Sequence, residues 1–421
     1  MDLKNIFIII FLVGVFIQLC LDQILEFIDF RHRKLYGRQI PEELAGQFSD
    51  EILDKTCRYE DAKYKFWIPR TFVSTALSLV LYFCGFYPWL FELIWSWCGR
   101  TFLTLFIFIF ASGIPSSIIS IPFSLYNQFG IEQKFGFNTM TIKTWILDGI
   151  KNLALSILVS APLVFVMVVL LEKFTFTWWI LLGSVYFAFS LILSVIYPTF
   201  IAPLFNKFTP LEEGELKERL EKLLAAAGFK SSGLFIMDAS KRSKHSNAYF
   251  TGFGKSKRVV LYDTLVEQLT PAEIESVLAH ELGHYKNHHI IKKLCCLVPV
   301  IFVVLFAISC FIRNPLLYSG FGFAVESVVP QQLLGVGLFL MMIVFGSYED
   351  LLSPVVNFFS RKDEFEADAF AKKLCGTGKN LCTALIKLNK ENLSEITPPK
   401  IYSIFNYSHP PLLERIRALK D

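Results

Sequence analysis

Two histidines and a glutamate form the pattern in this sequence that is best suited to chemistry. His280, Glu281 and His284 stand together in the stretch 277-VLAHELGHYKNHH-289. On a helix each residue turns by about 100°, so His280 and His284 project from nearly the same face. Two imidazoles on one face can bind a single zinc ion, and Glu281 can reach a water molecule on that ion as a general base. The pattern therefore predicts a hydrolytic zinc site.

The residues before this pattern mark the start of a helix. Thr270 can be the N-cap, Pro271 suits the first helical position, and Glu273 completes a T-x-x-E capping box. We therefore expect both histidines on one helix. The competing interpretation is a charged, solvated helix face that leads into a membrane span and binds no metal.

A catalytic zinc site needs a third protein ligand. One known arrangement places a glycine three residues and a histidine six residues after the second histidine, but this chain has Asn287 and Ile290 there. His288 and His289 would extend along the same helix, and a straight helix spreads such histidines over about 12 Å, too far for bonds of about 2 Å to one ion. We expect His288 and His289 to face solvent or the membrane interface.

An acidic segment further along the chain offers the third ligand. In 360-SRKDEFEADAFAKKL-374, Glu364 and Asp368 lie one helical turn apart. Glu364 can bind the metal, while Asp368 can accept a hydrogen bond from the other nitrogen of a ligand imidazole. Glu366 is the rival ligand, but it faces another side and no acidic residue follows it at four positions. A charged amphipathic helix without metal is the alternative.

The composition indicates a polytopic membrane protein. Hydrophobic residues make up 53% of the 421 positions and charged residues 19%, and the mean hydropathy is +0.48. The net charge of +4 comes without a long Lys/Arg block, so we expect no nucleic-acid partner. The nine cysteines show no CxxC spacing, so we expect reduced thiols instead of disulfides or a zinc ribbon.

Seven stretches are apolar and long enough, or nearly so, to cross a hydrocarbon core of about 30 Å. No small-residue cleavage site follows the first stretch, so we interpret it as a span and not as a cleaved signal peptide. The predicted spans lie near residues 5–24, 71–91, 102–125, 153–171, 177–200, 293–312 and 332–348.

The distribution of Lys and Arg predicts the orientation of these spans. Segment 25–70 contains nine Lys and Arg residues, whereas the loops on the opposite side contain only Arg100, Lys173 and Arg313. The positive-inside rule then places segment 25–70 and the predicted zinc site in the cytosol and the N-terminus in the lumen.

The chain divides into four parts. We expect residues 1–204 to carry spans one to five with the loop 25–70, and residues 205–292 to form a cytosolic α/β segment with the predicted zinc-protease helix. We expect residues 293–348 to carry spans six and seven, and residues 349–421 to form a cytosolic segment with the third ligand. Within the insert, the pattern predicts a helix over 211–229 and strands over 234–239, 247–252 and 258–263.

These pieces together resemble the integral-membrane CAAX prenyl proteases of the type 1 zinc metallopeptidase family. Besides 277–289 and 360–374, the resemblance rests on 241-KRSKHSNAYFTGFGKSKRVVLYDTL-265 and 406-NYSHPPLLERIRAL-419. Thr251 departs from the family pattern, which has an aromatic residue there. The resemblance implies a mainly α, polytopic fold of seven transmembrane helices around an intramembrane chamber, with a small cytosolic α/β zinc-protease insert.

The resemblance also implies roles for individual residues. It implies one zinc ion per chain with the ligands His280, His284 and Glu364, the catalytic base Glu281, an oxyanion-binding His409, and the supporting residues Arg361 and Asp368. It further implies that Asn247, Ala248, Tyr249 and Phe250 lie in an edge strand that pairs with the substrate backbone. From the sequence alone, an ordinary strand and an ordinary turn histidine remain open.

The implied activity is removal of the last three residues from farnesylated proteins that end in Cys-aliphatic-aliphatic-X, and some family members also make a second, upstream cut. Prenylated substrates and the lipid bilayer are then the partners, and the endoplasmic reticulum and inner nuclear membranes the location. Three alternatives are a quality-control protease for misfolded or translocon-trapped proteins, a scaffold with structural zinc, and a transporter. The transporter is suggested by Glu349 and Asp350 at the end of a span.

Overall fold

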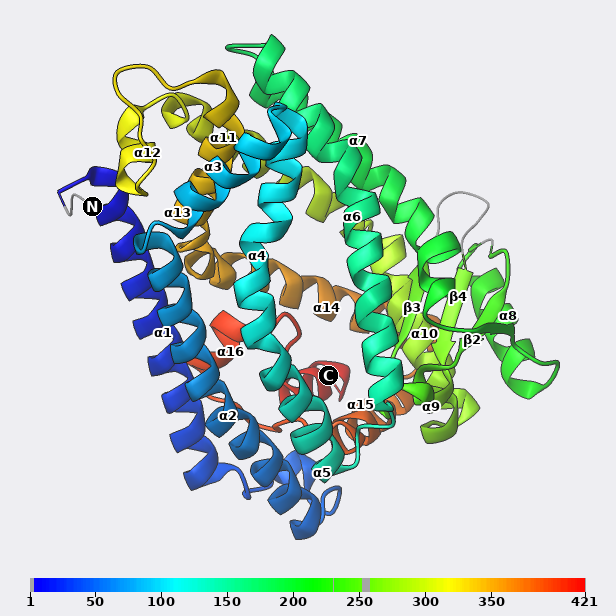
Figure 1. Ribbon diagram of the computed structural model, residues 1–421. Coiled ribbons are helices and arrows are strands. Elements are labelled where there is room, and N and C mark those ends of the chain that lie inside the picture. The colour runs from blue at the N-terminus through cyan, green and yellow to red at the C-terminus, as the bar shows by residue number, and fades with distance from the viewer. Residues whose placement is uncertain (1–3, 230, 252–257, 421) are drawn as a thin grey trace.

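Six helices are long and apolar enough to cross a membrane (Figure 1). The computed structural model describes residues 4–229, 231–251 and 258–420, and this count refers to them. Each helix overlaps one of the predicted spans. They are α1 (Ile6–Tyr36), α2 (Asp50–Phe83), the run Thr101–Phe135 with α4 (Thr101–Tyr126) and α5 (Gln133–Phe135), α6 (Ile142–Lys173), the run Trp178–Leu204 with α7 (Trp178–Ile196), and α11 (His289–Phe311).

Two of the predicted spans are not single straight helices in the structure. The last one contains α13 (Leu334–Gly346), whose 13 residues reach only about 20 Å at about 1.5 Å per residue. It is long enough only together with α14 (Ser353–Cys375), after a bend of 53°. The predicted span 71–91 is wrong at its end, because Gly85 adopts a left-handed φ of +79° and the separate helix α3 (Phe86–Cys98) begins after it.

The segment 25–70, predicted as a loop, is largely helical because α1 and α2 continue beyond their apolar parts. Buried Arg33 of α1 joins the two helices, since its Nε donates to Asp61 Oδ1 of α2 at 3.1 Å. Arg33 also pairs with Asp29 and with Glu395 of the C-terminal segment. A buried cation needs such complete pairing, so this cluster fixes the three segments to one another.

The spans are loosely packed against each other. In the six helices, between 6% and 22% of each apolar window is buried, whereas helices in a tight bundle bury a continuous stripe. Most apolar side chains therefore face either lipid or the interior of the arrangement. Figure 1 shows the helices standing around a common centre, as expected for a ring of spans.

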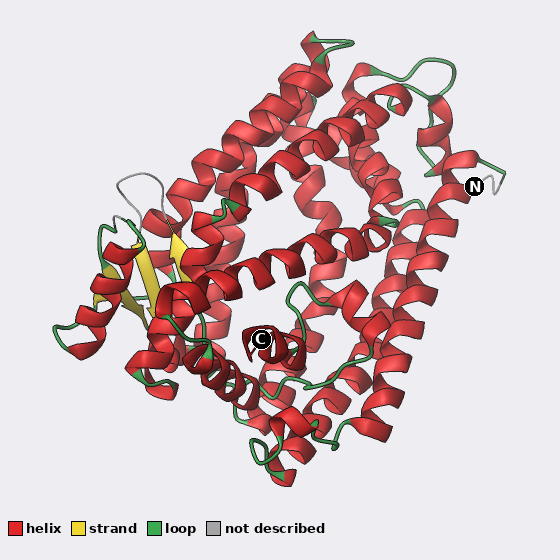
Figure 2. Cartoon of the chain, turned by 180° about the vertical axis from the view of Figure 1, so that it is seen from behind, coloured by secondary structure: helices red, strands yellow, loops and turns green. Residues whose placement is uncertain are grey.

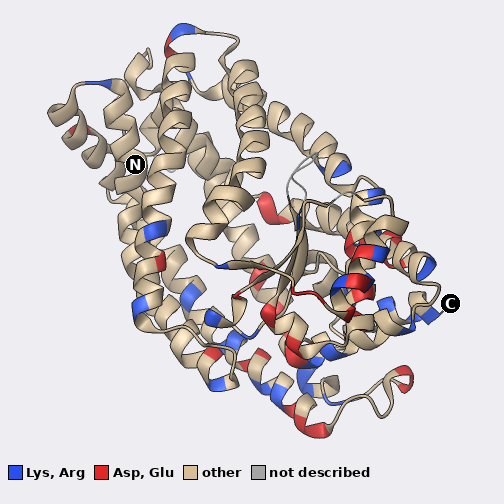
Figure 3. Cartoon of the chain, turned by 90° about the vertical axis from the view of Figure 1, so that its right-hand side faces the viewer, with Lys and Arg blue, Asp and Glu red and all other residues tan. Residues whose placement is uncertain are grey.

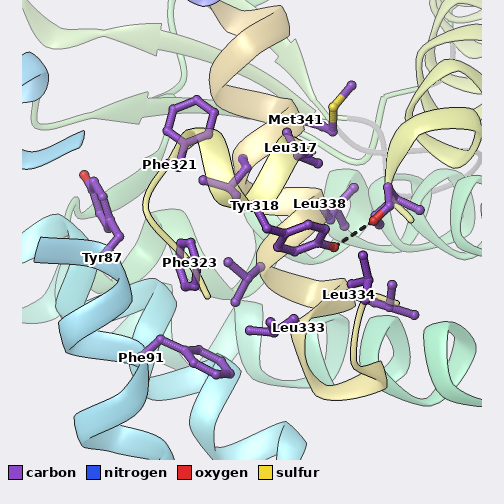
Figure 4. Packing of buried hydrophobic residues seen from close by; sticks show 14 of the residues in the cluster. Tyr87, Phe91, Leu317, Tyr318, Phe321, Phe323, Leu333, Leu334, Leu338 and Met341 are labelled. Atoms are coloured by element: carbon purple, nitrogen blue, oxygen red, sulfur yellow. Dashed lines mark hydrogen bonds between the residues drawn. The ribbon is translucent and has the colours of Figure 1, made fainter. Parts of the chain in front are cut away.

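Short helices close one end of this ring (Figure 1), and Figure 4 shows the apolar side chains packed between them. There α3, α12 (Pro315–Gly320) and α13 form an apolar core with Phe91 of α3 against Phe323, at 6.2 Å between ring centroids. Tyr318 is fully buried, and its hydroxyl has a hydrogen-bond partner there, because it donates to Ile312 O at 2.7 Å.

The insert between the fifth and sixth spans is a small sheet covered by helices (Figure 2). Its strand order is β1-β2-β4-β3, with β2 and β4 parallel and both outer pairs antiparallel. The strands β2, β3 and β4 confirm the predicted strands, although Gly252 of the range 247–252 lies outside the described residues, and β1 is not among the predictions. The bounds are β1 Phe208–Pro210, β2 Leu234–Met237, β3 Ala248–Thr251 and β4 Arg258–Tyr262.

A second hydrophobic core joins this sheet to the C-terminal helices. It contains Leu220 of α8 (Glu215–Ala226), Leu261 of β4, Ile274 of α10 (Pro271–Lys286) and Leu419. The remaining helices are α9 (Asp263–Gln268), α15 (Lys379–Glu391), α16 (Lys400–Asn406) and α17 (Leu412–Lys420). Helices α10 and α14 meet at this core, so two segments far apart in the sequence are held side by side.

Candidate metal centre

Helix α10 begins where the sequence predicts. Thr270 and Glu273 form the capping box, with Thr270 N donating to a Glu273 carboxylate oxygen at 2.8 Å, and Pro271 is the first helical residue. The helix then runs to Lys286 and carries His280 and His284 one turn apart on the side that faces α14.

A glycine lets α10 and α14 approach closely at this point. A Cβ atom on Gly283 would lie 2.7 Å from Ala367 Cα and 3.0 Å from Ala367 O. Ordinary carbon–carbon contacts are about 3.5–4.0 Å, so a larger residue would separate the helices. Gly283 stands between the two histidines, and Ala367 lies next to Asp368, so this contact sets the distance between the two halves of the site.

Three side chains converge between the helices, with both oxygens of Glu364 facing the two imidazoles. His280 Nε2 lies 3.2 Å from His284 Nε2 and 3.3 Å from Glu364 Oε2, and His284 Nε2 lies 3.2 Å from Glu364 Oε1. A tetrahedral zinc ion with bonds of about 2.0–2.1 Å separates its ligand atoms by about 3.3–3.4 Å. Glu364 Oε2 is buried and has no hydrogen-bond partner among the described residues, which a bound cation would provide. The donor set and its spacing fit zinc.

Asp368 and Arg415 hold the first imidazole. Asp368 Oδ1 lies 2.8 Å from His280 Nδ1, and Arg415 donates to both oxygens of Asp368 at 2.6 and 2.8 Å. With Nδ1 donating to a carboxylate, His280 Nε2 keeps its lone pair for a metal. Burial opposes a charge on His280, but the neighbouring carboxylates of Asp368 and Glu364 raise its pKa to about 9. Metal binding must therefore displace a proton.

The expectation that His289 faces solvent or the membrane interface is wrong. Helix α10 ends at Lys286, and His288 adopts a left-handed φ of 56°, which turns the chain before α11 begins. His289 is 1% exposed, and its Nδ1 lies 2.9 Å from Nδ1 of His284. His289 Nε2 lies 3.1 Å from Glu366 Oε2. The rejected ligand Glu366 therefore contacts the metal centre through His289.

The proton positions in this chain of contacts follow from the metal. A metal bound to His284 Nε2 would leave the proton of His284 on Nδ1, which then donates to the lone pair of His289 Nδ1. His289 then carries its proton on Nε2 and donates it to Glu366. In this arrangement a carboxylate orients each of the two imidazoles. Asp368 contacts His280 directly, and Glu366 acts on His284 through His289.

Glu281 follows the first ligand on the same helix and is partly buried. Burial raises the pKa of Glu281, although His280 and His284 act in the opposite direction. A carboxylate whose pKa moves toward neutral is a more effective general base. The role of Glu281 as a base stays a prediction.

His409 lies at the open side of the three ligands. Its side chain is exposed, and Nε2 is 3.4 Å from Glu364 Oε1. Arg361 of α14 supports this loop by donating to Ser403 O at 2.9 Å and to Tyr407 O at 2.7 Å, at the end of α16. The two residues predicted as oxyanion donor and support are therefore connected through one turn of the chain.

The strand predicted to hold substrate lies at the edge of the sheet. β3 pairs only with β4 among the described strands, so one of its edges is free, and β3 contacts α10, the helix that carries the two histidines. Ala248 is buried in the second core, and Asn247 precedes the strand with Oδ1 accepting from the Ala248 N–H at 2.8 Å. Tyr249 and Phe250 complete the described part of the predicted segment.

Two residues of the centre were missed by the sequence predictions, since Arg415 is absent from them and His289 was expected to face solvent or the membrane interface. Arg415 had a detectable signal, because it lies with Leu412, Ile416 and Leu419 at the helical spacing of a buried stripe. A lone arginine on such a stripe requires a buried carboxylate partner. No comparable signal marks His289, since its contact depends on the turn at His288.

The family models that match this chain cover nearly all of it. Residues 30–207 match the model described as "CAAX prenyl protease N-terminal, five membrane helices", and residues 210–421 match "Peptidase family M48". The boundary between them falls at β1, where the spans end and the insert begins.

Similar proteins match over most of their length. "CAAX prenyl protease 1" of Saccharomyces cerevisiae is 36% identical over 92% of this chain and 90% of its own, and the homologue of Homo sapiens is 34% identical over 94% and 92%. The crystal structure of S. mikatae Ste24p matches with a TM-score of 0.90 at 35% identity, over 98% of both chains. The chain therefore belongs to the membrane-embedded CAAX prenyl protease 1 members of peptidase family M48, and is a multi-pass zinc metalloendopeptidase.

Proposed function

We propose that this chain cleaves prenylated proteins that end in Cys-aliphatic-aliphatic-X and releases the last three residues. The observation that carries the proposal is the set His280, His284 and Glu364, whose ligand atoms have the spacing of a tetrahedral zinc site where α10 and α14 meet the spans. The names of the relatives point to the same substrate class. A substrate that is part lipid and part peptide suits a hydrolytic centre at the boundary of a ring of spans.

The residues around the metal have separate tasks in this reaction. One zinc ion per chain, held by His280, His284 and Glu364, would supply Lewis acidity for the scissile carbonyl and for water. Glu281 takes the proton of the attacking water and delivers it to the leaving amine. His409, on the open side, donates a hydrogen bond to the oxygen on which negative charge develops.

The substrate backbone binds along the free edge of β3. Residues 247–250 supply main-chain hydrogen bonds there, which accept different side chains in the last three residues of the substrate. Asp368 and Arg361 act indirectly, the first by holding His280 and the second by holding the turn before His409.

We also propose that the metal centre faces the cytosol in the endoplasmic reticulum or inner nuclear membrane. The proposal rests on the nine Lys and Arg residues of segment 25–70, which lies at the same end of the spans as the insert. Prenylated proteins meet membranes from the cytosol, which suits this orientation. The four-part division at residues 204, 292 and 348 belongs to the same proposal.

The test compares two peptides that differ only in the farnesyl group on the cysteine, with purified protein and with or without a zinc chelator. The proposal expects chelator-sensitive release of the tripeptide mainly from the farnesylated peptide. Equal cutting of both peptides would favour the quality-control protease. No cutting of either by zinc-loaded protein would contradict both activities. A longer farnesylated substrate shows whether a second, upstream cut follows.

A further inference from the structure

A cationic cavity lies outside the metal centre, between α2, the end of α4, and α5. Its volume is about 720 Å³. Lys55, Arg58 and Lys65 of α2 and Lys134 after α4 line it, and all four side chains are exposed. Figure 3 shows that charged residues gather toward this half of the molecule, while the other half carries few.

The only acidic residue among the lining residues is already neutralised from outside the cavity. Asp61 accepts from Arg33 Nε at 3.1 Å through Oδ1, and it pairs with Lys34 through Oδ2. The cavity therefore has an excess of positive charge.

Among the described residues, three of the four cations of the cavity have no carboxylate partner. Arg58 Nε lies 2.8 Å from Asp54, which is shared with Arg38. Within the described part of the chain, no carboxylate oxygen lies within 4.0 Å of the ammonium groups of Lys55, Lys65 and Lys134. Unpaired ammonium groups around a concave surface attract a multiply charged anion.

The other wall of the cavity is apolar and continues along the spans. Phe66 and Tyr126 line it with ring centroids 5.4 Å apart. On α2, Val73 lies seven residues after Phe66, on the same face, and is 42% exposed. On α4, Ile118 lies eight residues before Tyr126 and is 59% exposed. A charged cavity that continues into two exposed apolar stripes matches a phospholipid. The cavity can hold the headgroup, and the stripes along the spans can contact the acyl chains.

This cavity faces away from the metal centre. The opposite face of α2 carries Glu60 and Lys63, which line a separate cavity together with His409. Ala62 lies two residues after Glu60, and Lys65 lies two residues after Lys63. Each is therefore turned by about 200° around the helix from its counterpart and points out of the ring.

We propose that this cavity binds the phosphate group of an anionic phospholipid in the leaflet next to the metal centre. Basic pockets between membrane helices bind such headgroups, and clustered Lys and Arg add to the affinity for anionic lipid. Lys65 and Lys134 contact the phosphate from two different helices, while the acyl chains lie along α2 and α4. The bound lipid therefore joins two neighbouring spans that pack loosely on each other.

The experiment uses the full chain in detergent, titrated with phosphatidylinositol 4-phosphate or with phosphatidylcholine of the same acyl chains and observed by native mass spectrometry. The test variant is Lys55→Gln/Arg58→Gln/Lys65→Gln/Lys134→Gln. A matched control removes the same charge from exposed lysines elsewhere, Lys222→Gln/Lys373→Gln/Lys379→Gln/Lys400→Gln. We expect the anionic lipid to bind the test variant on the order of 100-fold more weakly than the wild type and the control variant.

Equal binding by wild type and test variant, or equal loss in both variants, would overturn the proposal, because the cavity would then add nothing to general surface charge. Tight binding of phosphatidylcholine would do the same. Competition with glycerol 3-phosphate separates the two sources of phosphate: soluble phosphate that binds as tightly as the lipid would exclude a lipid site. If the fourfold variant does not fold, Lys65→Gln/Lys134→Gln allows the same comparison.

Discussion

Replacing His289 by alanine is expected to weaken zinc binding although His289 is not a ligand. In the wild type, His284 Nδ1 lies 2.9 Å from His289 Nδ1, and His289 Nε2 lies 3.1 Å from Glu366. The variant removes the acceptor of the His284 N–H and leaves it without that partner in a largely buried position. The ring can then rotate away from the metal.

The size of the effect follows from the lost hydrogen bond. A buried donor without an acceptor costs about 1–3 kcal/mol, and loss of a residue that orients a metal-binding histidine costs about 10- to 100-fold in metal affinity. The loss of affinity corresponds to about 1.4–2.8 kcal/mol, since each tenfold change is about 1.4 kcal/mol, and it falls within the cost of the unpaired donor. We expect the dissociation constant for zinc to rise within this range.

The assay is competition between the purified protein and a chelator of known zinc affinity at fixed pH. His289→Asn keeps an acceptor oxygen near the position of Nδ1 and should recover most of the affinity. His288→Asn is the control, because His288 is exposed and asparagine tolerates its left-handed conformation. A zinc affinity of His289→Ala within twofold of the wild type would refute the reasoning.

Three further predictions concern the same region and its surroundings. Glu281→Gln should retain zinc but lower kcat by about 10²- to 10⁴-fold, measured by peptide cleavage and metal analysis; retained turnover would remove Glu281 as the base. Gly283→Ala should cost about 1–3 kcal/mol of stability and reduce zinc content, because its Cβ would press on Ala367, and a protein with unchanged melting temperature and zinc content would contradict this. A hydrogen bond with Glu132 raises the pKa of His245 in the folded protein. Protonated His245 therefore adds about 0.5 kcal/mol to the free energy of unfolding below pH 6.5, and this contribution is lost as the pH rises through the raised pKa. Thermal unfolding at pH 6 and pH 8 should show this loss of stability in the wild type but not in His245→Gln. An equal pH dependence in both proteins would exclude His245 as the cause.

Much of the metal centre can be predicted from local spacing. The capping box fixes where α10 begins, so His280 and His284 share a face. The same periodicity identifies Glu364 and Asp368 on α14, one turn apart. These predictions need only helical geometry, which depends on neighbouring residues and is therefore visible in the sequence.

Features that depend on a single turn could not be predicted in this way. Hydropathy continues past Phe83, so the sequence predicts one span where Gly85 in fact divides two helices. The turn at His288 similarly brings His289 back to the metal centre, although a continuous helix would carry it away. The three-residue strand β1 is defined by its pairing with β2 and has no pattern of its own.

The identity of the third ligand is tested most directly by the zinc content of Glu364→Ala. Purified wild-type protein should contain one zinc ion per chain and release the tripeptide from a farnesylated peptide in the same sample. Glu364→Ala should lose both the zinc and the activity, whereas Glu391→Ala, which removes an exposed carboxylate elsewhere, should keep both. Full zinc occupancy in Glu364→Ala would contradict the metal centre described for His280, His284 and Glu364.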